Sequence, residues 1–215
     1  MLFRSPISGP IGHPALGGSG LGDALIAFSQ GPSDRQQVMG AVAKSPPGQF
    51  LAYAPVGWVK GGSATVRWDP APEAFGTTTY AVLVDGRIRA GRLAGLSTRL
   101  RPRGLGDGIH HLQVLATDSL GQQTMTAQAD LKVDASPPQV SVRHSGGRGV
   151  KVRVFDVASG ALAKDTSISF GDGGREGHRL IARHTYSRSG GYVITVRSRD
   201  RVGHSLNAHL RVQIR

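Results

Sequence analysis

The sequence contains no cysteine, few aromatic residues and no long apolar run. Without cysteine the chain can form neither a disulfide framework nor a thiolate metal site. No segment approaches the ~18 consecutive apolar residues of a membrane-spanning helix, so no membrane span is expected. Aromatic residues make up only 6% of the chain and do not interleave with its basic residues, so we expect no sequence-specific nucleic-acid binding.

Helical periodicity and catalytic motifs are also scarce. The longest helical candidate, residues 34–43, is interrupted by Gly40 and β-branched residues. The sequence has no Gly-x-Ser-x-Gly elbow, and its Gly-rich stretches at 18–22 and 104–108 lack the lysine of a phosphate-binding loop. We therefore expect no enzymatic activity and no cofactor. Residues 1–6 lack the apolar stretch of a signal peptide, so any export signal is expected upstream of this chain.

The sequence is instead rich in glycine, with 31 residues. It also contains many short stretches in which apolar and polar residues alternate. A period of two places every second side chain on one face of a strand, so each stretch is expected to be a half-buried strand. One stretch ends in the pair Asp85-Gly86, which is typical of a hairpin turn. The clearest stretches are Ala64–Trp68, Tyr80–Val84, Val150–Val154 and Tyr192–Val196.

An internal repeat relates residues 108–121 to residues 190–203 at an offset of 82 positions. Each copy is expected to be a long strand that ends in an Asp-x-x-Gly turn, with Asp118 matching Asp200. An aspartate in such a turn can accept backbone N–H groups. A second strand is expected after each turn, at residues 124–133 and 206–214. Two long strands joined in this way indicate the last hairpin of an immunoglobulin-like sandwich, so the predicted fold class is all-β, with tandem immunoglobulin-like β-sandwiches.

Proline-rich breaks suggest the domain boundaries. Pro137-Pro138 is stiff and cannot join a central ladder, so we predict a linker at 135–138 between domains at 53–134 and 139–215. Residues 1–50 are Gly/Pro-rich with two candidate strands, Ala24–Phe28 and Gln37–Val42. Two strands are too few to be stable alone, so this segment is expected to be the tail of a truncated upstream β-domain, such as the last blade of a propeller.

Four ordered elements carry a family resemblance in the C-terminal domain. They are Ile168–Gly173, His184–Tyr186, Gly191–Ile194 and Asp200–Gly203. In this order they resemble the PKD domain family over residues 139–215. Ile168 stands where that family usually has tryptophan.

The preceding domain resembles fibronectin type III or bacterial immunoglobulin-like modules. Residues 66–72 with Trp68 look like the second strand of that family, residues 80–86 look like the third, and His110 replaces the tyrosine of the sixth. Both resemblances imply non-catalytic spacer or adhesion modules of extracellular or cell-surface proteins, often bacterial. This implication rests on the family, since a fold alone does not fix a function.

Metal binding has one sequence candidate. Asp172, in the Gly-rich turn of residues 170–173, is a weak calcium candidate with Asp156 or Asp165 nearby in sequence, and the favoured interpretation is that this aspartate caps the turn itself. The resemblance makes His184 a structural residue of its turn, and His204 is expected in a loop. No loop of the Asp-x-Asp-x-Asp-Gly type is present.

The charge is uneven along the chain. Residues 139–215 hold 14 Lys/Arg and 5 Asp/Glu, a net charge of +9 out of +12 for the whole chain. Such a basic half indicates contact with polyanions, or simply a solvated arginine-rich face. Strand alternation places Arg197, Arg199 and Arg201 on the solvent side of one strand, and Lys151 and Arg153 on the solvent side of another.

Three functions therefore remain open from the sequence. The first is a non-catalytic extracellular spacer or scaffold module. The second is a basic adhesion module that binds an anionic cell-wall polymer or polysaccharide through the five residues above. The third is the C-terminal part of a larger propeller-containing or enzymatic protein, whose upstream domain would be the partner of this chain.

Overall fold

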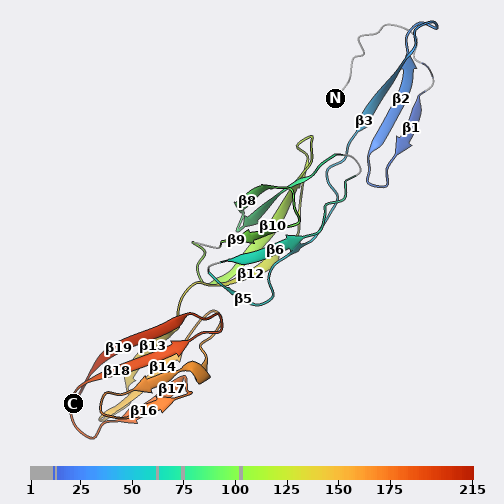
Figure 1. Cartoon of the computed structure of the whole chain (residues 1–215). Helices are drawn as coiled ribbons and strands as arrows, with labels where there is room; N and C mark the ends of the chain where they lie inside the picture. The colour runs from blue at the N-terminus through green and yellow to red at the C-terminus, as the bar shows by residue number, and fades with distance from the viewer. Residues whose placement is uncertain (1–11, 13, 62, 74–75, 102–103) are drawn as a thin grey trace. The chain divides into compact units, whose positions relative to one another are not determined.

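The computed structural model describes residues 12, 14–61, 63–73, 76–101 and 104–215. Within these ranges the regular structure consists of strands β1 to β19 and one short 3-10 helix, η1 (Ala163–Asp165) (Figure 1). The predicted all-β fold is confirmed. None of the described segments forms a helix long and apolar enough to cross a membrane.

The N-terminal residues form an antiparallel sheet of three strands, β1 (Ala15–Gly18), β2 (Ala24–Gln30) and β3 (Gln37–Ala43). Strands β2 and β3 match the two predicted strands, whereas β1 was missed because its Gly17-Gly18 pair has little strand propensity. The sheet buries little of its apolar surface, since Leu16 is 75% and Val38 is 84% exposed. The part of the predicted N-terminal segment at residues 1–11 and 13 lies outside the described residues.

Contacts divide the chain into two compact units, each made of several segments. The first unit comprises residues 1–53, 67–98 and 112–128, and the second comprises residues 54–66, 99–111 and 129–215. The second unit therefore contains the C-terminal residues together with several strands, or parts of strands, of the middle region. The predicted boundaries at 53–134 and 139–215 stay a prediction.

The middle region forms two sheets. One has the order β4-β6-β9 and is made of β4 (Ala52–Tyr53), β6 (Ala64–Trp68) and β9 (Ser97–Leu100). The other has the order β5-β12-β10-β7-β8, with β11 beside β10. Its strands are β5 (Trp58–Lys60), β12 (Ala129–Asp134), β10 (Gly108–Thr117), β7 (Thr79–Val84), β8 (Arg87–Leu93) and β11 (Gln123–Met125).

Two local features of these sheets follow from their residues. Asp85 and Gly86 have φ values of 51° and 72°, so the predicted hairpin turn between β7 and β8 is confirmed. Strands β5 and β12 run parallel, with Lys60 opposite Asp134. This register places a lysine and a buried aspartate at the same end of the sheet.

The predicted strand at residues 124–133 is divided in the structure into β11 and β12. The break begins at Thr126, whose Oγ1 accepts the backbone N–H of Val114 at 3.0 Å. The Thr126 N–H in turn donates to the Val114 carbonyl at 2.9 Å. A threonine hydroxyl that replaces a backbone acceptor in this way interrupts regular pairing, and alternation in the sequence does not reveal it.

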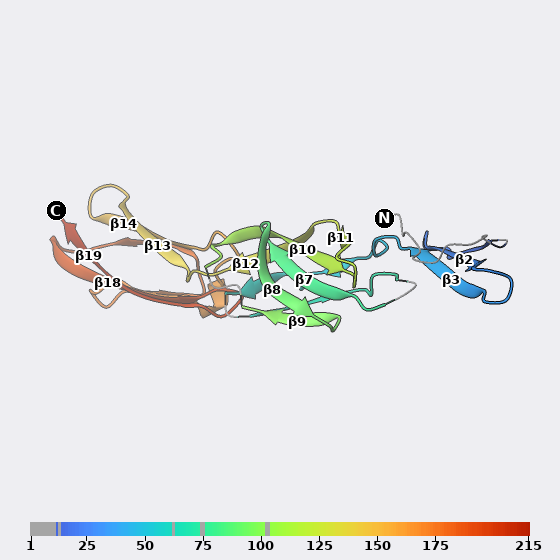
Figure 2. The same ribbon diagram turned by 90° about the horizontal axis from the view of Figure 1, so that it is seen from above.

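The C-terminal residues form a sandwich of two sheets that share one core. One sheet has the order β13-β14-β17, and Figure 2 shows β13 and β14 in a layer apart from β18 and β19. The other has the order β16-β15-β18-β19. The strands are β13 (Gln139–His144), β14 (Gly149–Phe155), β17 (Ile181–Thr185), β16 (Arg175–Gly177), β15 (Ser167–Ser169), β18 (Gly190–Arg199) and β19 (Ser205–Ile214).

The core of this sandwich follows the predicted alternation. Val152 on β14 and Ile194 on β18 are both fully buried and belong to one apolar cluster. Ile168, which stands in place of the family's tryptophan, is buried in the same cluster. The predicted inward faces of both strands are therefore confirmed.

A hydrogen bond from β10 shows how the histidine that replaces the family's tyrosine is used. His110 Nε2 lies 3.0 Å from the carbonyl oxygen of Gly106, four residues earlier. In the C-terminal sandwich the hydroxyl of Tyr192 donates to the Arg188 carbonyl at 3.0 Å, also four residues earlier. The two pairs correspond at the offset of 82, so the imidazole makes the contact that the tyrosine makes elsewhere.

Candidate functional site

The turn between β18 and β19 is organised by one buried aspartate. Asp200 is 1% exposed, and its Oδ1 accepts the backbone N–H groups of Val202 at 3.0 Å and His204 at 2.8 Å. These bonds account for the predicted role of the Asp-x-x-Gly sequence, in which the aspartate satisfies the turn's own donors.

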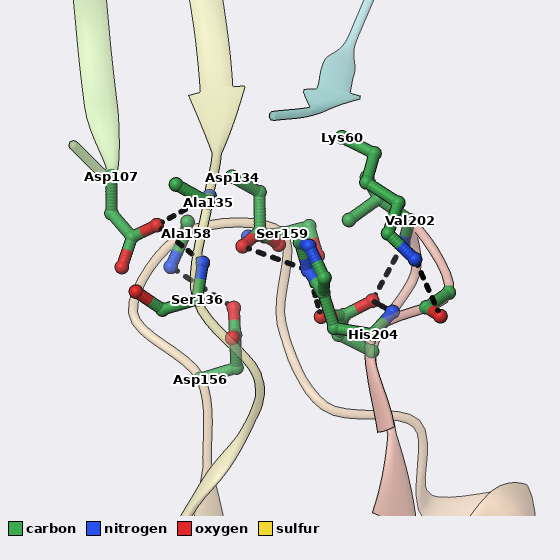
Figure 3. Close-up of polar contacts among 12 residues, drawn as sticks. Lys60, Asp107, Asp134, Ala135, Ser136, Asp156, Ala158, Ser159, Val202 and His204 are labelled. Atoms are coloured by element: carbon green, nitrogen blue, oxygen red, sulfur yellow. Dashed lines mark hydrogen bonds and ion pairs between the residues drawn. The ribbon is translucent and has the colours of Figure 1, made fainter. Parts of the chain in front are cut away.

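The other oxygen of Asp200 belongs to a cluster of ionisable side chains, of which Asp134 and His204 are labelled in Figure 3. Its Oδ2 lies 2.9 Å from His204 Nδ1, and the same nitrogen lies 3.5 Å from Asp134 Oδ1 at the end of β12. Asp134 is fully buried, and its Oδ2 accepts the backbone N–H of Ser159 at 3.3 Å. We call Asp134, Asp200 and His204 the carboxylate–histidine cluster.

Further polar contacts surround this cluster. The ammonium group of Lys60 on β5 donates to the carbonyl oxygen of Gly203 at 3.1 Å. Asp107 Oδ1 accepts the backbone N–H groups of Ala135 at 2.6 Å and Ser136 at 3.0 Å. Burial raises the pKa of Asp107, but these hydrogen bonds outweigh it and hold the pKa below its usual value. Residues 134–136 are therefore fixed by side chains from several elements of the second unit.

The first unit contains a corresponding turn after β10. Asp118 Oδ1 accepts the N–H groups of Leu120 and Gln122, each at 2.8 Å. Its Oδ2 lies 3.2 Å from the ammonium group of Lys44, which also lies 3.4 Å from Glu73. Burial raises the pKa of Asp118, yet the backbone bonds and Lys44 together lower it. One lysine thus forms ion pairs with two carboxylates here.

Asp172, the predicted calcium candidate, lies elsewhere in the C-terminal sandwich. Its Oδ2 lies 2.7 Å from His184 Nε2, and its Oδ1 accepts the N–H of Gly174 at 3.0 Å. His184 stacks on Phe170 at 4.2 Å between ring centroids and meets the edge of Tyr186 at 4.8 Å. The geometry matches the structural role expected for His184, and calcium binding at Asp172 stays a prediction.

The five polyanion candidates lie on two different sheets. Arg197 and Arg199 on β18, and Arg201 in the turn after it, are exposed. On β14, Arg153 is exposed and Lys151 is half-buried. Because β14 and β18 pack the same core from opposite sheets, their outer faces point in opposite directions. The two sets therefore cannot form one continuous surface.

The β18 face gains further arginines that the sequence analysis did not assign. The register pairs Val193 with Arg211 on β19 and Ser169 with Arg175 on β16, and both arginines are exposed. Alternation along each strand could have indicated their direction, but only the pairing places them on the same sheet face as Arg197. We call Arg175, Arg197, Arg199 and Arg211 the basic face.

The sequence analysis also missed the carboxylate–histidine cluster. His204 was expected in a loop and does lie in the turn after β18, but its contact with Asp134 joins positions 70 residues apart. The equivalence of Asp118 and Asp200 was the one available signal. It identified the turn but not the groups around it.

Comparisons with known proteins give the fold context of these sites. No protein-family model and no curated protein matches the sequence. Among solved structures, the PKD1 domain of the Vibrio cholerae metalloprotease PrtV is 17% identical, with 37% of this chain and 96% of that chain covered and a TM-score of 0.31. The FN1–FN3 domains of chicken CNTN1 are 13% identical, with 89% and 78% covered and a TM-score of 0.38.

A third match is to the fibronectin(III)-like modules of Clostridium thermocellum CbhA, at 11% identity, with 77% of this chain and 94% of that chain covered and a TM-score of 0.35. These similarities concern the fold alone. The chain is thus similar to a PKD domain and to fibronectin type III domains, the two families that its motifs resemble.

Proposed function

We propose that this chain is a non-catalytic spacer module of a secreted or cell-surface protein, with joints held in place by buried polar contacts. The proposal rests on the side-chain contacts that the two Asp-x-x-Gly turns make. Each turn binds side chains from outside its own hairpin: Asp118 binds Lys44, and the Asp200 turn contacts Asp134 and Lys60. The buried carboxylates thus hold together segments that are far apart in the sequence.

A spacer has to keep its ends at a fixed separation, and flexible linkers do not do so. Residues 134–138 combine two restraints against bending. Pro137-Pro138 is stiff because proline fixes φ, and the preceding N–H groups of Ala135 and Ser136 are bonded to Asp107. Together with the Lys60 contact to Gly203, these restraints favour a rigid connection within the second unit.

The absence of cysteine makes the proposal easy to test with spin labels. Cysteines introduced at Val56, which is fully exposed, and at Gln213 on β19 would label both parts of the second unit. Pulsed electron paramagnetic resonance should give one narrow distance distribution. It should broaden in a Lys60→Ala/Asp107→Ala variant, which removes contacts to the turn and to residues 135 and 136.

A Lys164→Ala variant is the matched control, because this exposed lysine of η1 takes no part in these contacts. Its distribution should stay narrow. A broad distribution in the unmodified chain would contradict the spacer role. Location is tested separately, by asking whether a membrane-impermeant reagent labels the protein on intact cells.

The second candidate function is adhesion to an anionic extracellular polymer, and the basic face favours it. Four exposed arginines on one sheet can donate paired hydrogen bonds to phosphate, sulfate or carboxylate groups. Binding to an anionic polysaccharide or wall polymer should weaken as salt rises, since exposed charges are screened.

The opposite sheet supplies the control for this candidate. An Arg197→Ser/Arg199→Ser variant should lose most of the binding, whereas Lys151→Ser/Arg153→Ser removes the same charge from the other outer face and should retain it. Equal loss in both variants would indicate attraction to net charge rather than a basic face. Binding that does not change with salt would exclude the electrostatic mechanism.

A further inference from the structure

We propose that Asp134, Asp200 and His204 form a binding site for a divalent transition metal ion, with Zn²⁺ as the best match. This inference does not depend on the spacer role. The three ligand atoms lie within 4.8 Å of one another, and the separations from His204 Nδ1 are 2.9 and 3.5 Å. Zinc bonds of about 2.1 Å place neighbouring donor atoms about 3 to 3.5 Å apart. The cluster thus already has nearly the spacing of a ligand set.

The hydrogen bonding of the cluster is incomplete without an ion. The Nδ1 atom of His204 carries at most one hydrogen, and that hydrogen can serve Asp200 at 2.9 Å but not Asp134 as well. Asp134 Oδ1 has no hydrogen-bond partner among the described residues, although the side chain is fully buried. An ionised oxygen in such a place is costly unless a cation compensates it. A divalent ion would bind both carboxylates at once.

A second buried polar group adjoins the cluster. Ser159 is 4% exposed, and its Oγ also has no hydrogen-bond partner within the described part of the chain. Its backbone N–H donates to Asp134 Oδ2, so this residue lies directly against the carboxylate. We expect this hydroxyl, or a water molecule, to supply the fourth ligand. His204 keeps 14% of its side chain exposed, which leaves a path from solvent.

The matching turn in the first unit has a lysine where the second turn has a histidine. Asp118 makes the same two backbone bonds as Asp200, but Lys44 lies between it and Glu73. A lysine has three donors and serves both carboxylates. At the second turn an imidazole stands between the two carboxylates, and the nearby ammonium of Lys60 is bonded to a carbonyl oxygen instead. Of these two turns, the second therefore brings an imidazole nitrogen together with two carboxylates.

The donor set selects the type of ion. Calcium and magnesium take oxygen ligands, whereas an imidazole nitrogen with two carboxylates suits zinc and its neighbours in the first transition row. The two carboxylates would neutralise the charge of Zn²⁺. We therefore expect zinc to bind far more tightly than calcium at this cluster.

The test is a calorimetric titration of the tag-free, chelator-treated chain with ZnCl₂. We expect a 1:1 complex and a higher Tm with zinc, and no such effect of CaCl₂ at the same concentration. Asp134→Asn and His204→Gln should each weaken binding about tenfold or more, since even outer-shell changes cost that much. Asp118→Asn, at the matching turn, should leave zinc affinity unchanged.

Two further measurements keep the result interpretable. Far-UV circular dichroism shows whether each variant folds, and visible d–d bands of the Co²⁺-substituted wild type would report ligation without any variant. Lys60→Ala should retain zinc binding even if it broadens the spin-label distances, which separates this proposal from the spacer role. Absence of zinc binding by the wild type, or binding that survives both Asp134→Asn and His204→Gln, would overturn the proposal.

Discussion

Asp118 and Asp200, 82 positions apart, each accept two backbone N–H groups of their own turn through a single carboxylate oxygen. The second oxygen of each lies against a different nitrogen group, the Lys44 ammonium in one turn and the His204 imidazole in the other. The two copies of the repeat therefore share the hydrogen bonds to their own turn and differ in the partner of the second carboxylate oxygen. That difference underlies both the spacer proposal and the metal site.

The alternation along β18 gives the first prediction. Ile194→Ala should lower the free energy of unfolding by about 2 to 5 kcal/mol, because it removes a fully buried side chain and leaves a cavity. Val193→Ala, at the neighbouring position that is 44% exposed, should change it by no more than about 0.5 kcal/mol. Urea denaturation measures both. Similar losses in the two variants would contradict the assigned faces of the strand.

The Gly-rich turn of the PKD-like motif gives the second prediction. Gly171 has a φ of +86°, and a Cβ there would lie 2.7 Å from the Val193 carbonyl oxygen. Gly173 has a φ of +98° with open space around it. Gly173→Ala should cost about 1 to 2 kcal/mol for the left-handed backbone alone, and Gly171→Ala should cost clearly more because β18 would also have to move. Thermal unfolding compares them, and equal losses would show that close packing is unimportant here.

The buried hydroxyl of Tyr186 gives the third prediction. The pKa of Tyr186 is raised to about 12, mainly by burial and to a smaller extent by the negative charge of Asp172. The folded state thus favours the neutral phenol, and this contribution to stability is complete below the ordinary tyrosine pKa near 10 and declines as the pH rises toward 12. In an absorbance titration Tyr186 should ionise late, and Tyr186→Phe should remove that late step. Loss of an earlier step instead would contradict the burial effect.

Acid stability gives the fourth prediction. Burial raises the pKa of Asp172, but hydrogen bonds from His184 and from the Gly174 N–H outweigh it and lower the pKa below 3.8. A carboxylate with a lowered pKa stabilises the fold above about pH 4 and loses this effect as the pH falls through its folded-state pKa. The urea midpoint should therefore fall more steeply below pH 4 in the wild type than in Asp172→Asn. Asp107 and Asp118 remain in both proteins, so the difference isolates Asp172. If the urea midpoints of the two proteins fall in parallel as the pH is lowered, Asp172 does not contribute to acid stability in this way.

The sequence by itself determined several of the strands, their buried faces and one hairpin turn. Period-two alternation located β6, β7, β14 and β18 because one face of each strand is buried, and the pair Asp85-Gly86 specified a hairpin because both residues tolerate positive φ. The outward direction of Arg197 and Arg199 followed from the same rule. The motif match over residues 168–203 indicated the family of the C-terminal fold.

Tertiary structure decided which distant positions meet. The parallel pairing of β5 with β12 brings Lys60 opposite Asp134, and the turn after β18 brings His204 to within 3.5 Å of Asp134. Local patterns carry no information on such contacts, because a cross-chain register depends on how whole sheets pack. The same reason explains why Lys151 and Arg153 were not separable in sequence from the arginines of β18, although the fold places them on the opposite face.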